Sequence, residues 1–134
     1  MPCYYLKLKE TNVSDPTTEP NAFHDPERIA GYHAHVYYDP ATKPAAQRLR
    51  EAIGTRFNVR LGSWHDGPVG PHSAAMYQVL YAVEELPRLL PFLMLNREGL
   101  SILVHPVTGD DYTDHADFPL WLGKPLPLLL ETLR

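Results

Sequence analysis

Apolar and polar residues alternate along the chain in several short stretches, and this pattern predicts strands. In Gly31–Tyr38 β-branched and aromatic residues dominate, and an Asp-Pro pair ends the stretch. Residues 58–65 (NVRLGSWH) alternate in a similar way, and residues 74–83 (AAMYQVLYAV) have the length and residue types of a strand. Residues 100–104 (LSILV) form a short apolar run that predicts a buried strand.

Two segments between these strands carry apolar residues at helical spacing. Residues 44–57 place Leu49 and Ile53 on one face, and Thr42 is positioned to cap this helix. Residues 84–96 contain five leucines, with Pro87 in the first turn. The resulting order, βαββαβ, predicts an α+β fold of the ferredoxin-like kind, with one antiparallel sheet. Its first and third strands would lie in the middle, with both helices on one face.

This arrangement leaves the other face of the sheet without helices. Because antiparallel sheets bury at least one side and large apolar patches are rarely left exposed, we expect the open face to be hydrated, to bind a ligand or to pack against a second copy of the chain. The sequence therefore predicts a homodimer. In the first strand the apolar set suits the helices, so His33, His35 and Tyr37 should point to the open face.

The first 28 residues differ in composition from the rest. Residues 3–9 (CYYLKLK) could form an edge strand, and residues 11–25 are rich in Pro, Thr, Asp and Asn. We expect residues 1–28 to form an N-terminal arm, either mobile or exchanged with a partner subunit. Residues 29–134 should then form a single domain.

Composition excludes several classes of protein. The 134 residues are 44% hydrophobic and 21% charged, which is typical of a globular domain. A net charge of −4 argues against a nucleic-acid partner, and the apolar runs are too short to cross a membrane. A single cysteine cannot form an internal disulfide. These features predict a small cytoplasmic protein.

Seven histidines stand out from this composition. His33 and His35 lie on one side of the same strand, roughly 7 Å apart at the backbone, and can converge on one ion. His105 ends the fourth strand, which should lie antiparallel beside the first, so we expect it next to His33. Three imidazoles from two adjacent strands predict a metal site, which suits iron, zinc, copper or nickel.

Two further histidines come from loops. His72 follows a Pro/Gly-rich loop at residues 67–71, and His115 lies in a polar stretch after the last predicted strand. Each could complete the coordination shell or act as a general acid or base; the alternative is a surface histidine held by loop hydrogen bonds. Asp110 and Asp114 are the candidates for a carboxylate ligand. Nucleotide-binding and nucleophile-elbow motifs are absent from the sequence.

Four segments together resemble the DOPA 4,5-dioxygenase family, a group of small aromatic-ring-cleaving dioxygenases. They are residues 31–38 (GYHAHVYY), 67–72 (GPVGPH), 105–109 (HPVTG), and 114–115 (DH) followed by 121–123 (WLG). The resemblance implies a ferredoxin-like domain that dimerises through its sheet. It also implies extradiol cleavage of a catechol, such as DOPA, by non-haem iron and O2.

In this interpretation His33, His35 and His105 hold iron(II). Zinc or another divalent metal could replace the iron in a purified sample. His72 and His115 serve as acid and base or as alternative ligands, and Tyr37 bonds a substrate oxygen. Two other hypotheses remain open. One is a dimeric module of the same fold that binds a metal or small ligand without oxygenase activity. The other is a structural dimer whose histidines line a wet interface.

Overall fold

The computed structural model describes residues 23–134. The edge strand predicted at residues 3–9, and most of the predicted N-terminal arm, lie outside the described residues. Residues 23–28, the described end of that arm, are exposed and include the 3-10 helix η3 (Pro26–Arg28). Asp25 caps it by accepting a hydrogen bond from the Glu27 N–H.

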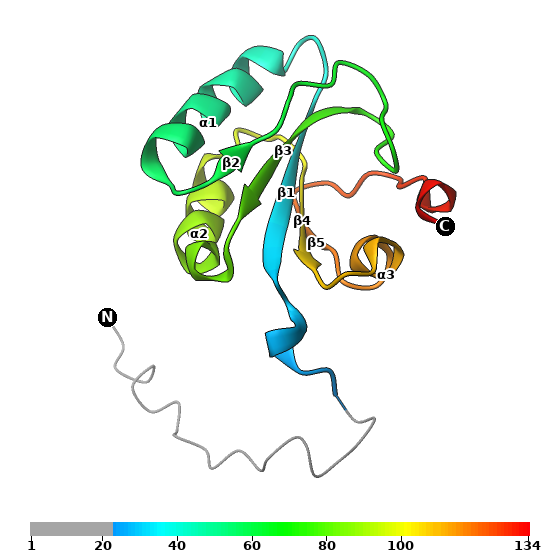
Figure 1. Cartoon of the computed structure of the whole chain (residues 1–134). Coiled ribbons are helices and arrows are strands. Elements are labelled where there is room, and N and C mark those ends of the chain that lie inside the picture. The colour runs from blue at the N-terminus through cyan, green and yellow to red at the C-terminus, as the bar shows by residue number, and fades with distance from the viewer. Residues whose placement is uncertain (1–22) are drawn as a thin grey trace.

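Five strands form one sheet, and helices lie on both of its sides (Figure 1). The strands are β1 (Gly31–Tyr38), β2 (Arg60–Leu61), β3 (Ala75–Tyr81), β4 (Ile102–Val107) and β5 (Leu120–Leu122). The helices are α1 (Lys43–Arg56), α2 (Leu86–Asn96) and α3 (Asp111–Ala116), with short 3-10 helices η4 (Val83–Glu85) and η5 (Leu130–Leu133). The strand order is β2-β3-β1-β4-β5, with every neighbouring pair antiparallel. The predicted α+β class, the βαββαβ order and the central position of β1 and β3 among the first four strands are confirmed.

The structure corrects the predicted second and fourth strands. The stretch predicted at residues 58–65 forms only the two-residue β2. Four residues lie between Arg60 and His65, but only three lie between their partners Met76 and Leu80, so one additional residue interrupts the ladder. The fourth strand runs from Ile102 to Val107 instead of residues 100–104, which places His105 within the strand rather than after it.

The end of the chain adds elements that the sequence did not predict. The polar stretch around His115 is the short helix α3, and β5 pairs with β4, so β4 is not an edge strand. The sheet therefore has five strands instead of four. Within residues 23–134, no helix has the length and apolar character needed to cross a membrane.

The main core lies between the sheet and the two long helices. Ala34 and Val36 of β1 are fully buried against Leu49 and Ile53 of α1 and Leu93 of α2. Figure 1 shows α1 and α2 together on this side of the sheet. Because residues of opposite parity in a strand face opposite sides, this packing turns the histidines of β1 to the other face, as predicted.

The other face is partly covered by the chain itself. Tyr37, Met76 and Leu103 form a second apolar cluster, and Leu126 and Leu128 pack against it. Residues 124–129, hereafter the C-terminal segment, run along this side, where Figure 1 also places α3. The segment is tied down by three hydrogen bonds, from Ser101 Oγ to Lys124 O, from Ser73 Oγ to Pro127 O and from the Leu129 N–H to Pro71 O. The expectation of an uncovered face is thus wrong for this half of the sheet, and the dimer predicted to cover it stays a prediction.

Candidate metal centre

Five of the seven histidines gather on the face of the sheet that α1 and α2 do not cover. His33 and His35 come from β1, His105 from β4, His72 from the loop before β3, and His115 from α3. The predicted metal ligands and the two predicted acid–base histidines are therefore brought into one cluster. His24 instead contacts Arg28, and His65 pairs with Met76.

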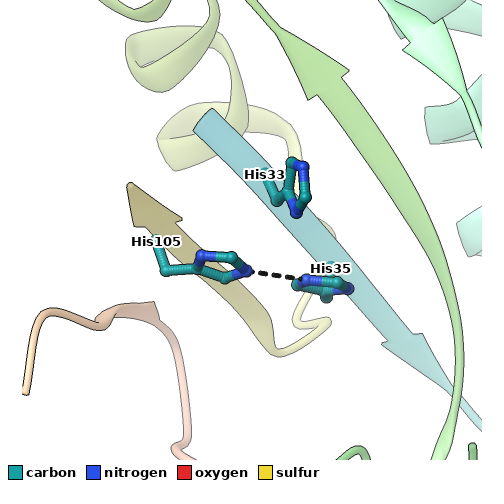
Figure 2. Close-up of side chains that lie close together, drawn as sticks. All are labelled: His33, His35 and His105. Carbon is teal, nitrogen blue, oxygen red and sulfur yellow. Dashed lines mark hydrogen bonds between the residues drawn. The ribbon is translucent and has the colours of Figure 1, made fainter. Parts of the chain in front are cut away.

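Strand register accounts for the first three members. His33 lies directly opposite His105 in the β1–β4 ladder, and His35 follows two residues later on the same face. The ring centres of His33 and His105 are 5.1 Å apart, and those of His33 and His35 are 6.0 Å apart. Figure 2 shows the three rings close together, with a hydrogen bond between His35 and His105. The two Nε2 atoms that it joins are 3.1 Å apart.

His72 is positioned by two backbone pairings. Its backbone exchanges hydrogen bonds with Val69 across the Pro/Gly-rich turn, and it also forms a bridge with Leu128 of the C-terminal segment. The resulting ring lies 4.1 Å from that of His35, centre to centre. Its Nδ1 atom is 2.7 Å from the hydroxyl oxygen of Tyr37, so the predicted site tyrosine contacts a site histidine.

His115 is delivered by α3. Asp110 caps this helix by accepting hydrogen bonds from the N–H and hydroxyl of Thr113, at 3.1 and 2.7 Å. The His115 Nδ1 atom lies 2.7 Å from the carbonyl oxygen of Asp111 one turn earlier. Its ring centre is 4.0 Å from that of His105, which joins the helix to the strand histidines.

Backbone carbonyls determine which nitrogen is available in two of the rings. The His105 Nδ1 atom lies 2.8 Å from the carbonyl oxygen of Pro106, and His115 makes the equivalent contact with Asp111. A carbonyl only accepts, so Nδ1 carries the proton in both rings and Nε2 keeps its lone pair. Metal-binding histidines characteristically donate their other ring N–H in this way.

Burial favours the neutral form of four of these imidazoles, those of His33, His35, His72 and His105. His35 and His105 are each 2% exposed, and desolvation holds the pKa of His35 well below its ordinary value and lowers that of His105 to about 3. Burial lowers the pKa of His72 to about 4 and also lowers that of His33. Neighbouring imidazoles add to each shift, because one protonated ring disfavours another. The neutral form is the one that binds metals.

The two carboxylates considered as ligands serve the local backbone instead. Asp114 is buried and accepts hydrogen bonds from the N–H and hydroxyl of Thr108, which tie α3 to the end of β4. Asp110 is engaged as the cap of α3. Neither belongs to a group of converging donors in the described part of the chain. Among the described residues, the converging donor atoms of the cluster are therefore all imidazole nitrogens.

The histidines form two overlapping donor groups. One is His33, His35 and His105, as predicted, and the other is His35, His72 and His115; within each, the three donor atoms lie within 4.8 Å of one another. The 3.1 Å between the Nε2 atoms of His35 and His105 suits adjacent ligands of one ion, given metal–nitrogen bonds of about 2.1 Å. The His35 Nδ1 atom is buried without a hydrogen-bond partner in residues 23–134. These donors fit a divalent first-row metal.

The second donor group was not predicted as a unit. The sequence marked His72 and His115 singly, because nothing in their spacing shows that they meet at His35. The sequence did contain one sign of the helix that carries His115: Asp110 followed by Thr113 is typical of a capped helix start. That pattern would have placed His115 on a helix rather than in a loop.

The chain has relatives among known proteins. Residues 32–132 match the family described as the Dopa 4,5-dioxygenase family. The chain is 33% identical over 132 residues to a DOPA 4,5-dioxygenase from Amanita muscaria, covering 92% of this chain and 58% of the relative. It is also 33% identical over 115 residues to an uncharacterized 21.2 kDa protein from Botryotinia fuckeliana, covering 77% of this chain and 63% of that protein. The chain thus spans about six-tenths of the length of these curated relatives.

A solved structure resembles the whole described fold. The crystal structure of a protein from Nostoc punctiforme, described as a candidate dioxygenase, superimposes with a TM-score of 0.83 at 54% sequence identity. The match covers 84% of this chain and 97% of the other. With the family match extending over three-quarters of its residues, this chain belongs to the Dopa 4,5-dioxygenase family.

Proposed function

We propose that this protein is a metal-dependent extradiol dioxygenase that cleaves the ring of DOPA or a related catechol with O2. Family membership and the name of the Amanita relative support the reaction class. The single observation that carries the proposal is the cluster of five histidines around His35, in which backbone carbonyls fix two rings with Nε2 unprotonated. Buried neutral imidazoles at these distances suit non-haem iron.

We assign the metal to His33, His35 and His105. These side chains stand on two adjacent central strands, which hold them more rigidly than loops would. His33 is only half-buried, so this side of the site is open to a substrate. A bound iron(II) would supply the Lewis acidity and redox chemistry that allow O2 to react with an aromatic ring.

His115 and His72 then differ in their roles. The His115 Nε2 atom has a free lone pair, so it can accept a proton from a catechol hydroxyl. Burial raises the pKa of the Tyr37 phenol above its ordinary value, so Tyr37 keeps its proton and donates it to His72 Nδ1. His72 therefore carries a proton on Nε2, from which it can donate a hydrogen bond to an oxygen atom of the substrate or of O2.

Oxygen consumption by the metal-loaded protein tests the reaction. The protein is loaded with iron(II) without air, then given O2 and a panel of catechols that includes DOPA. We expect O2 uptake and a yellow ring-opened product, both lost in His35→Ala and retained in His24→Ala, which changes an exposed histidine outside the cluster. If the iron-loaded protein consumes no O2 with any catechol, it is not a dioxygenase of this kind. Bound metal without O2 uptake would favour a ligand-binding module.

Metal content of single variants tests the assignment of ligands. His33→Ala and His105→Ala should lose most of the bound metal, while His72→Ala should retain it and lose turnover. Elemental analysis after reconstitution distinguishes these cases. If His72→Ala and His115→Ala lose the metal while His33→Ala keeps it, the ion is bound by the second donor group instead.

A further inference from the structure

A groove of about 410 Å³ opens beside His33, at the end of the sheet where β1 begins. Its lining includes Gly31 and His33 of β1, Leu80 of β3, Val107 of β4 and Arg60 of β2. Its volume lies in the range typical of small-molecule sites. Because His33 belongs both to this groove and to the first donor group, the groove leads to the histidine cluster.

Register places Arg60 in line with the predicted metal ligands. Arg60 pairs with Leu80, Leu80 with His33, and His33 with His105, so these four residues form one row across β2, β3, β1 and β4. Residues directly opposite one another share a face of the sheet. With strands about 4.8 Å apart, the backbone of Arg60 lies roughly 10 Å from that of His33. That separation leaves room for an aromatic ring between the guanidinium and the histidines.

The charge of Arg60 has no partner in residues 23–134. Arg60 is exposed, and it makes no ion pair or side-chain hydrogen bond with any described residue. Two other arginines that could meet an anionic substrate are engaged elsewhere. Arg28 contacts His24 at 2.7 Å, and Arg97 donates to the carbonyl oxygen of Leu100. Neither of them lines the groove beside His33.

We infer that Arg60 binds an anionic group on the side chain of the aromatic substrate, so that the site selects catechols that carry a carboxylate. This inference rests on the proposed function. The aromatic ring would lie over Leu80, with its hydroxyls toward His33 and its side chain toward β2. A guanidinium binds a carboxylate through two parallel hydrogen bonds, which makes arginine selective for that group.

Turnover of a matched series of substrates tests the assignment. The series is DOPA, 3,4-dihydroxyphenylpropionate, dopamine and 4-methylcatechol, of which the first two carry a carboxylate. In Arg60→Gln we expect kcat/KM to fall roughly 10- to 100-fold for the two carboxylates and to change little for the other two, since one charged hydrogen-bonded contact is lost. Arg60→Lys should recover part of the loss. Arg48→Gln, which changes an exposed arginine on α1, is the matched control.

Binding separates this inference from the proposed reaction. Calorimetry without O2 measures the affinity of the iron(II)-loaded protein for dihydroxyphenylpropionate and for 4-methylcatechol. A preference for the carboxylate that disappears in Arg60→Gln supports the assignment even if no catechol is turned over. Equal losses for all four substrates, no loss for any, or no carboxylate preference in the unaltered protein would overturn it. Thermal unfolding of both Arg60 variants checks that they remain folded.

Discussion

His35 occupies a different position from the other four histidines because it belongs to both donor groups. Its ring lies 4.1 Å from His72 and 5.1 Å from His105, centre to centre, and it is almost fully buried. His35 is therefore a metal ligand whichever of the two donor groups holds the ion. Its position in the middle of β1, between β3 and β4, gives it a rigid support.

We therefore predict that His35→Ala abolishes metal binding, as measured by elemental analysis after reconstitution. Losing one of three protein ligands removes a large part of the binding free energy. The metal-free variant should remain folded by circular dichroism, because the removed ring carries a buried nitrogen without a partner in the described residues. His35→Ala with full metal occupancy would exclude both donor groups.

The contact between Tyr37 and His72 yields a second prediction. Tyr37→Phe removes the hydroxyl 2.7 Å from His72 Nδ1 and leaves the ring packed beside Trp121. Removing a group that orients a site histidine typically costs 10- to 100-fold in activity. We expect kcat to fall by about that factor with metal content unchanged. A variant as active as the parent protein would show that this hydrogen bond does not orient His72 for the reaction.

At the level of elements, α3 depends on a single buried carboxylate. Asp114 is 1% exposed and accepts two hydrogen bonds from Thr108, so it ties α3 to the end of β4. The same helix carries His115 into the cluster. The geometry of the site is therefore coupled to a residue that contributes no ligand atom.

Asp114→Asn should lower the free energy of unfolding by roughly 1–3 kcal/mol, since it weakens a pair of buried hydrogen bonds to a charged acceptor. Urea denaturation of the metal-free protein measures the change. Asp111→Asn, an exposed position on the same helix, is the control. A loss of stability that is equal in both variants would contradict the role of Asp114.

The elements that the sequence predicted correctly are those with a clear period. Alternation in β1 was sufficient to place His33 and His35 on one face, and antiparallel topology brought His105 to them. The six-residue α3 and the three-residue β5 are too short for any period to be visible. The second donor group depends on the pairing of His72 with Leu128, a contact between distant residues that no local pattern encodes.

For the molecule as a whole, the neutral histidines predict how stability depends on pH. The pKa values of His72 and His105 are lowered to about 4 and about 3, while in the unfolded chain histidine titrates near 6.5. Below about pH 6.5 the unfolded chain therefore binds protons that the folded protein does not, and the free energy of unfolding falls. This stability is complete above pH 6.5 and is lost as the pH falls toward 4 and then 3.

Urea denaturation of the metal-free protein at pH 7.5, 6.0 and 5.0 checks this prediction. We expect the urea concentration at the midpoint of unfolding to fall steadily from pH 7.5 to pH 5.0. In His72→Ala the slope with pH should be smaller, because one of the titrating groups is gone. Equal midpoints at pH 7.5 and 5.0 would show that the cluster is not held neutral in the folded state.

The proposed homodimer also belongs to this scale. Much of the sheet face expected to pair with a second copy is covered by the C-terminal segment, but Leu120 of β5, on the outermost strand, is 45% exposed. An edge strand with exposed apolar residues is suited to pairing with another chain. Light scattering across a range of concentrations tests this proposal, and a monomer throughout would refute it.

The bridge between His72 and Leu128 has a consequence for biosynthesis. The histidines of the cluster lie between positions 33 and 115 of the chain. One of them, His72, is held by a backbone pairing with Leu128, which comes later in the sequence than any of them. A nascent chain on the ribosome could pair β1 with β3, yet His72 would lack its final support until Leu128 had emerged. Metal uptake into the completed cluster would accordingly follow translation of this region, and it would depend on the ions that the cell offers at that moment.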